Sequence, residues 1–189
     1  MKILAIDAAR TTGWCFGNGS EVPDSGSIRL AGGDGEIEDL PASMAGFLLR
    51  KIRQHKPELI ALEQYLNPAV QMGQAPVVTS LLLHGSVCAM ARLYRIPFVT
   101  CTPPQWRKSF VGRSTARPRS DGRRTPKQKA EDRAATKAMV LDRAKLLGWL
   151  PQDCTDNDRA EAIGIWAWAT ALYSRYDPAN PPKLELFRG

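Results

Sequence analysis

Two short apolar runs, each ending in a carboxylate, dominate the pattern of hydrophobic and polar positions along the chain. They span residues 2–7 (KILAID) and residues 58–63 (ELIALE). Runs that are rich in Ile and Leu, with no polar residue inside them, are typical of strands buried on both faces of a sheet. If the two strands are parallel neighbours, their carboxyl ends lie at one edge of the sheet, where open α/β folds keep their sites. We therefore expect Asp7 and Glu63 to converge.

The rest of the pattern predicts an α/β fold. Further strands are expected at 13–17, 25–30 and 96–101, the first of them returning antiparallel to the N-terminal strand. Helical spacing or composition predicts helices at about 37–54, 76–94, 102–110, 127–147 and 156–173. The strand at 96–101 follows a helix immediately, as in βαβ units. A chain of 189 residues suits one domain, expected over 1–176, with a loosely held tail at 177–189.

The last predicted helix carries acids on the stripe that should pack on the core. That stripe consists of Asp158, Glu161, Ala162, Ile165, Ala169 and Leu172. Asp156 and Asp158 at the helix start are also explained by capping and by the helix dipole. Glu161 lies one turn further in, where an unpartnered acid on an apolar face is unfavourable.

Together these acids suggest a metal site, although each has a simpler explanation by itself. Asp7 suits a turn before Thr11, and Glu63 suits a pair with an arginine. Converging carboxylates repel one another unless a cation lies between them, and ligand sets made only of oxygen suit Mg²⁺ or Mn²⁺. Four scattered cysteines without a Cys-x-x-Cys pair, and only two histidines, argue against zinc and against a disulfide framework.

Most of the net charge of +7 lies in one segment. Residues 112–129 contain seven basic residues and one acid, a net charge of +6, with two prolines, two glycines and almost no large apolar residue. This composition predicts a mobile loop that contacts a polyanion, or else a solvated insert without a partner. The candidate DNA-binding residues in and just before it are Arg107, Lys108, Arg113, Arg117, Arg119, Arg123, Arg124, Lys127 and Lys129.

Acids beside a basic loop suggest a nuclease, because two divalent cations about 4 Å apart can activate a water and stabilise the leaving oxygen of a phosphodiester. The motifs also resemble the RuvC branch of the RNase H-like superfamily, the Holliday junction resolvases. The resemblance rests on ILAID (3–7), Thr12-Gly13, ALEQ (61–64) and DRAEAIG (158–164). It extends to the region 102–108, TPPQWRK, which precedes the basic loop.

Two positions depart from that family's pattern. Its usual Asp-x-x-Asp-Ala motif has Glu161 as the second acid here, and its common Asp-Pro-Gly opening is Asp7-Ala8-Ala9. The departures suggest a divergent branch, such as the phage-encoded RuvC-like endonucleases. They leave open whether Glu161 or Asp156 completes the metal site.

The resemblance implies an RNase H-like mixed sheet, a homodimer with two active sites, and paired nicks across branched DNA such as a Holliday junction. It implies Mg²⁺ or Mn²⁺ as the cofactor. The catalytic and metal-binding residues that it implies are Asp7, Glu63, Asp158 and Glu161, with Asp156 as a further candidate ligand.

Several apolar and aromatic positions allow two interpretations. The helix at 76–94 has more apolar residues than one packed face needs, which suits a dimer surface or, as we favour, a buried crossover helix. Trp106 and Phe110 could stack on an unpaired base, although a core position is the commoner role for such a tryptophan. We expect His84 to be a satisfied core histidine.

Three other functions compete with a junction resolvase. The first is another RNase H-like nuclease, acting on flaps, forks or RNA–DNA hybrids. The second is an inactive nucleic-acid-binding module. The third is half of an actin-like sugar kinase, which the chain length and the absence of a Gly-rich nucleotide loop disfavour.

We expect neither a membrane span nor a signal peptide, because the sequence lacks a long uncharged apolar run and lacks a leader that is first charged and then apolar. The expected location is the cytoplasm of a bacterial or phage-infected cell.

Overall fold

A five-stranded mixed sheet forms the centre of the computed structural model, which describes residues 1–30, 37–65, 74–116 and 125–173. The strands are β1 (Ile3–Asp7), β2 (Thr11–Gly17), β3 (Asp24–Arg29), β4 (Leu59–Glu63) and β5 (Phe98–Cys101), in the spatial order β3-β2-β1-β4-β5. β1, β2 and β3 pair antiparallel, whereas β1, β4 and β5 are parallel. The predicted parallel pairing of the two apolar runs is therefore confirmed.

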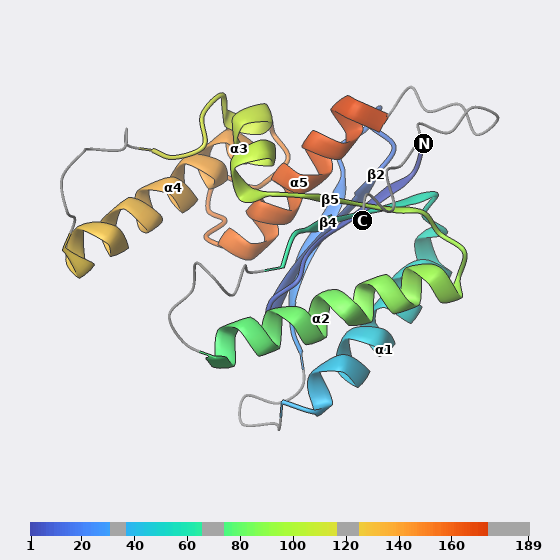
Figure 1. Cartoon of the computed structure of the whole chain (residues 1–189). Coiled ribbons are helices and arrows are strands. Elements are labelled where there is room, and N and C mark those ends of the chain that lie inside the picture. Colours follow the sequence, from blue (N-terminus) through green and yellow to red (C-terminus); the bar gives the residue numbers. More distant parts are fainter. Residues whose placement is uncertain (31–36, 66–73, 117–124, 174–189) are drawn as a thin grey trace.

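Helices cover both faces of this sheet. α1 (Asp39–His55) and α2 (Gln74–Leu93) lie on one face, and α3 (Pro103–Val111), α4 (Pro126–Leu146) and α5 (Asn157–Tyr173) lie on the other (Figure 1). Alternation along β1 divides the core accordingly. Ile3 and Ala5 pack in the cluster that contains α5, while Leu4 and Ile6 pack in the cluster that contains α1 and α2.

Local sequence signals explain the two helices that flank the basic segment. α3 and α4 both begin with a proline after a threonine, and in each case a glutamine three residues beyond the threonine completes a capping box. Because α4 begins at Pro126, Lys127 and Lys129 lie in its first turn and not in the expected loop. Residues 117–124 of that loop, and residues 174–189 with the predicted tail at 177–189, lie outside the described residues. The mobility of the loop and the loosely held tail therefore stay predictions.

α5 is the central helix of its layer and is buried on several sides, whereas its sequence predicted a helix with one buried stripe. Almost every residue from Ala160 to Ala169 is buried, because α5 packs on the sheet on one side and on α3 and α4 on the other. Leu172, assigned to the core stripe, is 59% exposed at the helix end. The prediction of a single packed face was wrong for this reason, although Glu161, Ala162 and Ile165 are buried as expected.

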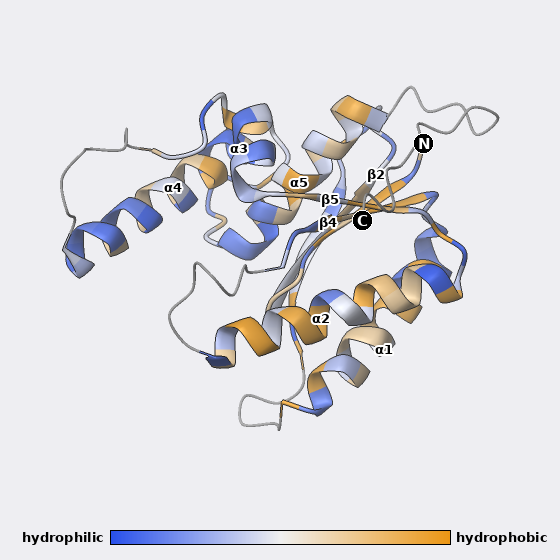
Figure 2. Cartoon of the chain, in the orientation of Figure 1, coloured by the Kyte–Doolittle hydropathy of each residue, from blue (hydrophilic) through white to orange (hydrophobic). Residues whose placement is uncertain are grey.

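α2 is buried along one face only, so the favoured interpretation of it as a buried crossover helix holds for that face and not for the other. Leu83, Val87 and Ala91 are fully buried against the sheet and α1, whereas Val78 and Leu81 are more than 40% exposed. Figure 2 shows hydrophobic residues along most of this helix. Among the described helices, α2 is the one with a length and composition that would also allow a membrane span, a test that core helices of soluble proteins pass as well.

Candidate active site

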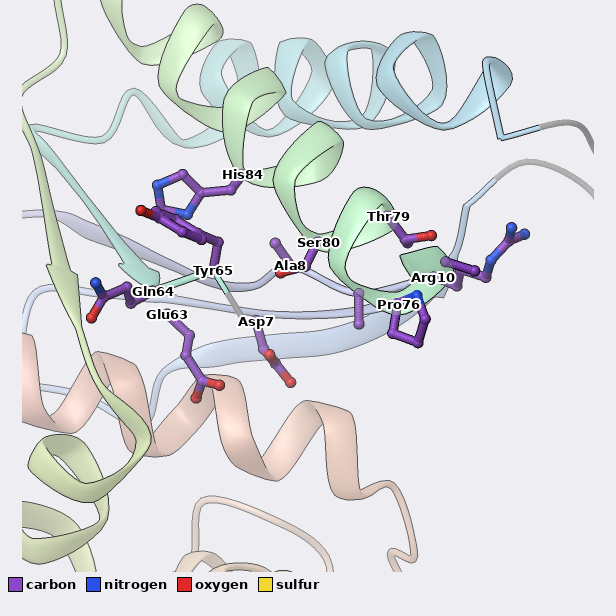
Figure 3. A pocket seen from close by; sticks show the side chains of 12 residues that line it. Asp7, Ala8, Arg10, Glu63, Gln64, Tyr65, Pro76, Thr79, Ser80 and His84 are labelled. Atoms are coloured by element: carbon purple, nitrogen blue, oxygen red, sulfur yellow. The ribbon is translucent and has the colours of Figure 1, made fainter. Parts of the chain in front are cut away.

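The two strand-terminal acids project from the same face of the sheet. Asp7 and Glu63 each lie two residues beyond a buried alanine, Ala5 or Ala61, that packs in the cluster containing α5. Side chains two residues apart on a strand share a face. Figure 3 accordingly shows both carboxylates pointing away from α2 and toward α5. The expected convergence of Asp7 and Glu63 is thus present.

α5 brings two further acids to this edge. Its first turns approach β2 closely at Gly13, the residue paired with Asp7, where an added Cβ would collide with the backbone carbonyl of Asp158. This close approach places Asp158 and Glu161 beside Asp7. Ligand oxygens of the three carboxylates all lie within 4.8 Å of one another.

Two basic side chains from α3 and α4 enter the acidic cluster. The Arg107 Nη2 atom lies 3.1 Å from Glu161 Oε1. The Lys137 Nζ atom lies 3.4 Å from Glu161 Oε2 and 3.6 Å from Asp158 Oδ1. Arg107, a candidate DNA contact from the sequence, is therefore committed to the acidic cluster in this structure, and its side chain is only 21% exposed.

Glu63 is held by a tryptophan from α3. The Trp106 indole Nε1 donates a hydrogen bond of 2.6 Å to Glu63 Oε2. The ring is fully buried against α5 at Gly164, where an added Cβ would come within 2.5 Å of it. Trp106 and Phe110 are thus core residues, which decides between the two roles considered for them.

Crowded, buried negative charge perturbs the acids. Burial, and then the charges of Glu63, Glu161 and Asp158, raise the pKa of Asp7 well above its usual range. Burial likewise raises the pKa of Glu63 to about 6, against the lowering effect of the Trp106 hydrogen bond. Burial raises the pKa of Asp158 as well, while Lys137 opposes it. Such a cluster gains from a cation that neutralises it.

The cluster suits a divalent metal ion. Asp7, Asp158 and Glu161 offer oxygen ligands only, close enough to share one ion, and hard cations such as Mg²⁺ and Mn²⁺ prefer such ligands. The negative charge that raises the pKa of Asp7 is the charge that such an ion would neutralise. The residues therefore fit the implied cofactor.

Asp156 serves a different purpose. Its Oδ1 accepts a hydrogen bond from the backbone N–H of Arg159, and its Oδ2 accepts one from the Ser27 hydroxyl. These contacts make Asp156 the N-cap of α5 and tie that cap to β3. The geometry favours Glu161 over Asp156 as the fourth acid of the cluster.

Solved structures share this architecture. Thermus thermophilus RuvC aligns over 93% of this chain and 96% of its own, with a TM-score of 0.60 and 18% identity. The chain has the fold of RuvC. The T. thermophilus RuvC in complex with Holliday junction substrate gives a TM-score of 0.61 at 18% identity, covering 93% of this chain and 95% of that one. The yeast mitochondrial Holliday junction resolvase Ydc2 gives 0.51 at 16%, covering 92% and 80%. Comparisons with family models and with curated proteins find no match.

On this RuvC fold the remaining basic candidates are distributed around α3 and α4. Lys108, Arg113, Lys127 and Lys129 are exposed, and Arg113 donates a hydrogen bond to Met139 Sδ. The other four, Arg117, Arg119, Arg123 and Arg124, lie outside the described residues. The sequence did not lead us to predict Lys137 as a residue of the site. Its position three residues before buried Val140 marks it as lying beside the packed face of α4, but several lysines share that helix.

A pocket of about 470 Å³ opens next to Asp7 and Glu63, on the α2 side of the strand ends (Figure 3). Tyr65, Pro76, Thr79 and His84 are among its lining residues. His84 packs edge-on against the Tyr65 ring, and its Nδ1 is buried without a hydrogen-bond partner within the described part of the chain. A backbone hydrogen bond involving Glu63 acts on the pKa of the same imidazole, in the direction opposite to burial. The satisfied core histidine therefore stays a prediction.

Metal binding should strengthen as the pH rises through about 6, the pKa of Glu63, because protonated carboxyls are poor ligands.

The stability of the metal-free protein should change in the opposite direction, falling as the pH rises. A raised folded-state pKa contributes stability that is complete below the ordinary value of 4.5 and lost as the pH rises through about 6. The shift of Glu63 corresponds to about 2 kcal/mol. Urea unfolding in EDTA at pH 4 and pH 7.5 measures the summed effect of the raised acids, which include Asp7 and Asp158. Glu63→Gln should reduce the difference between the two pH values by the share of Glu63.

Glu161→Gln should reduce metal binding and DNA cleavage more than Asp156→Asn, because Glu161 lies in the cluster and Asp156 caps α5. Asp156→Asn should lower the free energy of unfolding by less than about 1 kcal/mol, since Asn is also a favourable N-cap residue. Cleavage assays and thermal unfolding of both variants make the comparison. An inactive Asp156→Asn beside an unaffected Glu161→Gln would reverse the assignment.

Proposed function

We propose that this protein is a metal-dependent, structure-selective endonuclease that cleaves phosphodiesters in branched DNA such as Holliday junctions. The observation that carries the proposal is the convergence of Asp7, Glu63, Asp158 and Glu161 at one sheet edge of a RuvC fold. The T. thermophilus neighbour bound to Holliday junction substrate supports branched DNA as the substrate class.

The acids would act by holding divalent ions against the scissile phosphate. Mg²⁺ or Mn²⁺, held by these acids, would supply the Lewis acidity for two-metal-ion hydrolysis of a phosphodiester. Asp7, Asp158 and Glu161 provide the charge, and Glu63 completes the set. The buried Trp106 ring fixes the Glu63 carboxylate, so that it enters the reaction already oriented.

DNA binding is assigned to the basic surface around α3 and α4. The exposed residues Lys108, Arg113, Lys127 and Lys129 belong to it. The arginines at 117, 119, 123 and 124 are contacts predicted from the sequence alone, because they lie outside the described residues. These side chains would contact phosphates, which gives affinity that falls with salt and does not depend on sequence.

A homodimer is proposed through α2. Its exposed apolar side chains, which include Val78 and Leu81, lie on the side of the helix that the described residues of its own chain leave uncovered. Pairing two copies across α2 would bury these side chains and give two active sites, as paired cleavage of a four-way junction needs.

Leu81→Glu should convert this dimer to a monomer, because it places a charge on the apolar face of α2 proposed as the interface. Folding should be retained, since Leu81 is 42% exposed within one chain. Analytical ultracentrifugation gives the oligomeric state. Arg53→Glu on the exposed side of α1 is the matched control and should remain dimeric.

The function itself is tested with a panel of labelled substrates. Four-way junction, fork, flap, RNA–DNA hybrid and linear duplex are each incubated with Mg²⁺, Mn²⁺ or EDTA. Symmetric nicks in the junction, dependent on metal, support the proposal. Preference for flaps, forks or hybrids would instead identify another RNase H-like nuclease, and junction binding without cutting of any substrate would identify a binding module.

A further inference from the structure

We propose that Lys137 is a resident cation of the active site, and that its ammonium limits the DNA-free protein to one divalent ion. The inference rests on the proposed nuclease function and deepens it. It begins from Glu161, whose two carboxylate oxygens are both engaged by cations of the chain: Arg107 at 3.1 Å and Lys137 at 3.4 Å.

Charge balance sets the number of ions. Asp7, Glu63, Asp158 and Glu161 carry four negative charges when ionised, and Arg107 and Lys137 carry two positive ones. One divalent ion neutralises the remaining charge of −2. A second ion would leave an excess of two positive charges in a largely buried site, which is unfavourable without further anions.

The two basic side chains differ in how readily they can leave. Arg107 is 21% exposed and stacks on the Trp106 ring, with its guanidinium carbon 4.8 Å from the ring centroid. Lys137 is 43% exposed, on a flexible stem. Its two contacts, at 3.4 and 3.6 Å, are long for charge-assisted hydrogen bonds. Lys137 is therefore the exchangeable cation of the pair.

This arrangement makes binding of the second ion depend on the presence of substrate DNA. A DNA phosphate adds negative charge to the site and offers the ammonium another anionic partner. Lys137 can then release Asp158 and Glu161 to a second ion. The DNA-free protein is thereby kept from assembling the complete two-ion site.

Mn²⁺ titration of the metal-free, DNA-free full-length protein at pH 7.5 tests the inference, with isothermal calorimetry for affinity and electron paramagnetic resonance for bound ions. We expect one Mn²⁺ per wild-type chain. Lys137→Met should bind a second ion, and it should bind the first about tenfold more tightly than wild type. The gain in affinity is smaller than the full Coulomb repulsion between ammonium and metal would give, because the half-exposed ammonium of the wild type can move into solvent. Lys137→Arg should behave like wild type. Lys145→Met, about 12 Å further along α4, is the matched control and should not differ from wild type.

The outcomes separate this inference from the proposed function. If Mn²⁺ binds in an Asp7-dependent manner but Lys137→Met has wild-type stoichiometry and affinity, the role of Lys137 is overturned while the metal site stands. Two ions bound to the wild-type chain without DNA would also overturn it. If no variant binds Mn²⁺, or if Asp7→Asn binds it normally, the metal site itself fails and the inference fails with it.

Discussion

Asp7→Asn should reduce DNA cleavage by about 1,000-fold or more, because it removes a metal-directed charge while preserving the size of the side chain. DNA binding should remain, or tighten, since a negative charge has been removed near the phosphates. Without metal the variant should also be more stable than wild type at pH 7.5. Burial and neighbouring acids raise the pKa of Asp7, which means that its ionised form destabilises the fold. The uncharged Asn removes this destabilisation.

Single-turnover cleavage, DNA affinity in EDTA and thermal unfolding with and without Mn²⁺ measure these effects. The rise in melting temperature on adding Mn²⁺ should be lost in Asp7→Asn. Asp142→Asn, on an exposed position of α4, is the control and should match wild type in all three measurements. Near wild-type cutting by Asp7→Asn in Mg²⁺ would exclude Asp7 from the metal site.

Gly13→Ala should impair cleavage about 100-fold through geometry alone, since a displacement of about 1 Å can have this effect on a preorganised site. A Cβ at Gly13 collides with the backbone carbonyl of Asp158, so the start of α5 must move away from β2. Asp158 and Glu161 then move away from Asp7. The collision should also lower the free energy of unfolding by about 1–3 kcal/mol.

Gly46→Ala in α1 controls for the general effect of adding a methyl group. Its Cβ would meet Arg50 at 3.8 Å, an ordinary contact, so the protein should be as stable as wild type or more stable by up to about 1 kcal/mol. Urea unfolding and cleavage rates of both variants are compared. A Gly13→Ala protein with wild-type stability and activity would show that α5 has room to spare at this position.

Much of this fold and part of its site could be predicted from the sequence, because they depend on local patterns. The apolar runs and the helical spacing are patterns within a few residues, and they located the five strands and five helices of the described residues to within a few positions. The acids at the ends of β1 and β4 followed from the same reasoning, since parallel strands end at a common edge.

The tertiary structure alone decided which partners those acids have. Trp106 reaches Glu63 across 43 positions and Arg107 reaches Glu161 across 54, while Lys137 is one of several lysines on α4. Burial of α5 on all sides and the partial exposure of α2 likewise depend on which elements pack around each helix. Periodicity reports the faces of one element, but the choice of partner for each face is made by the packing of the whole chain, and no local pattern carries that information.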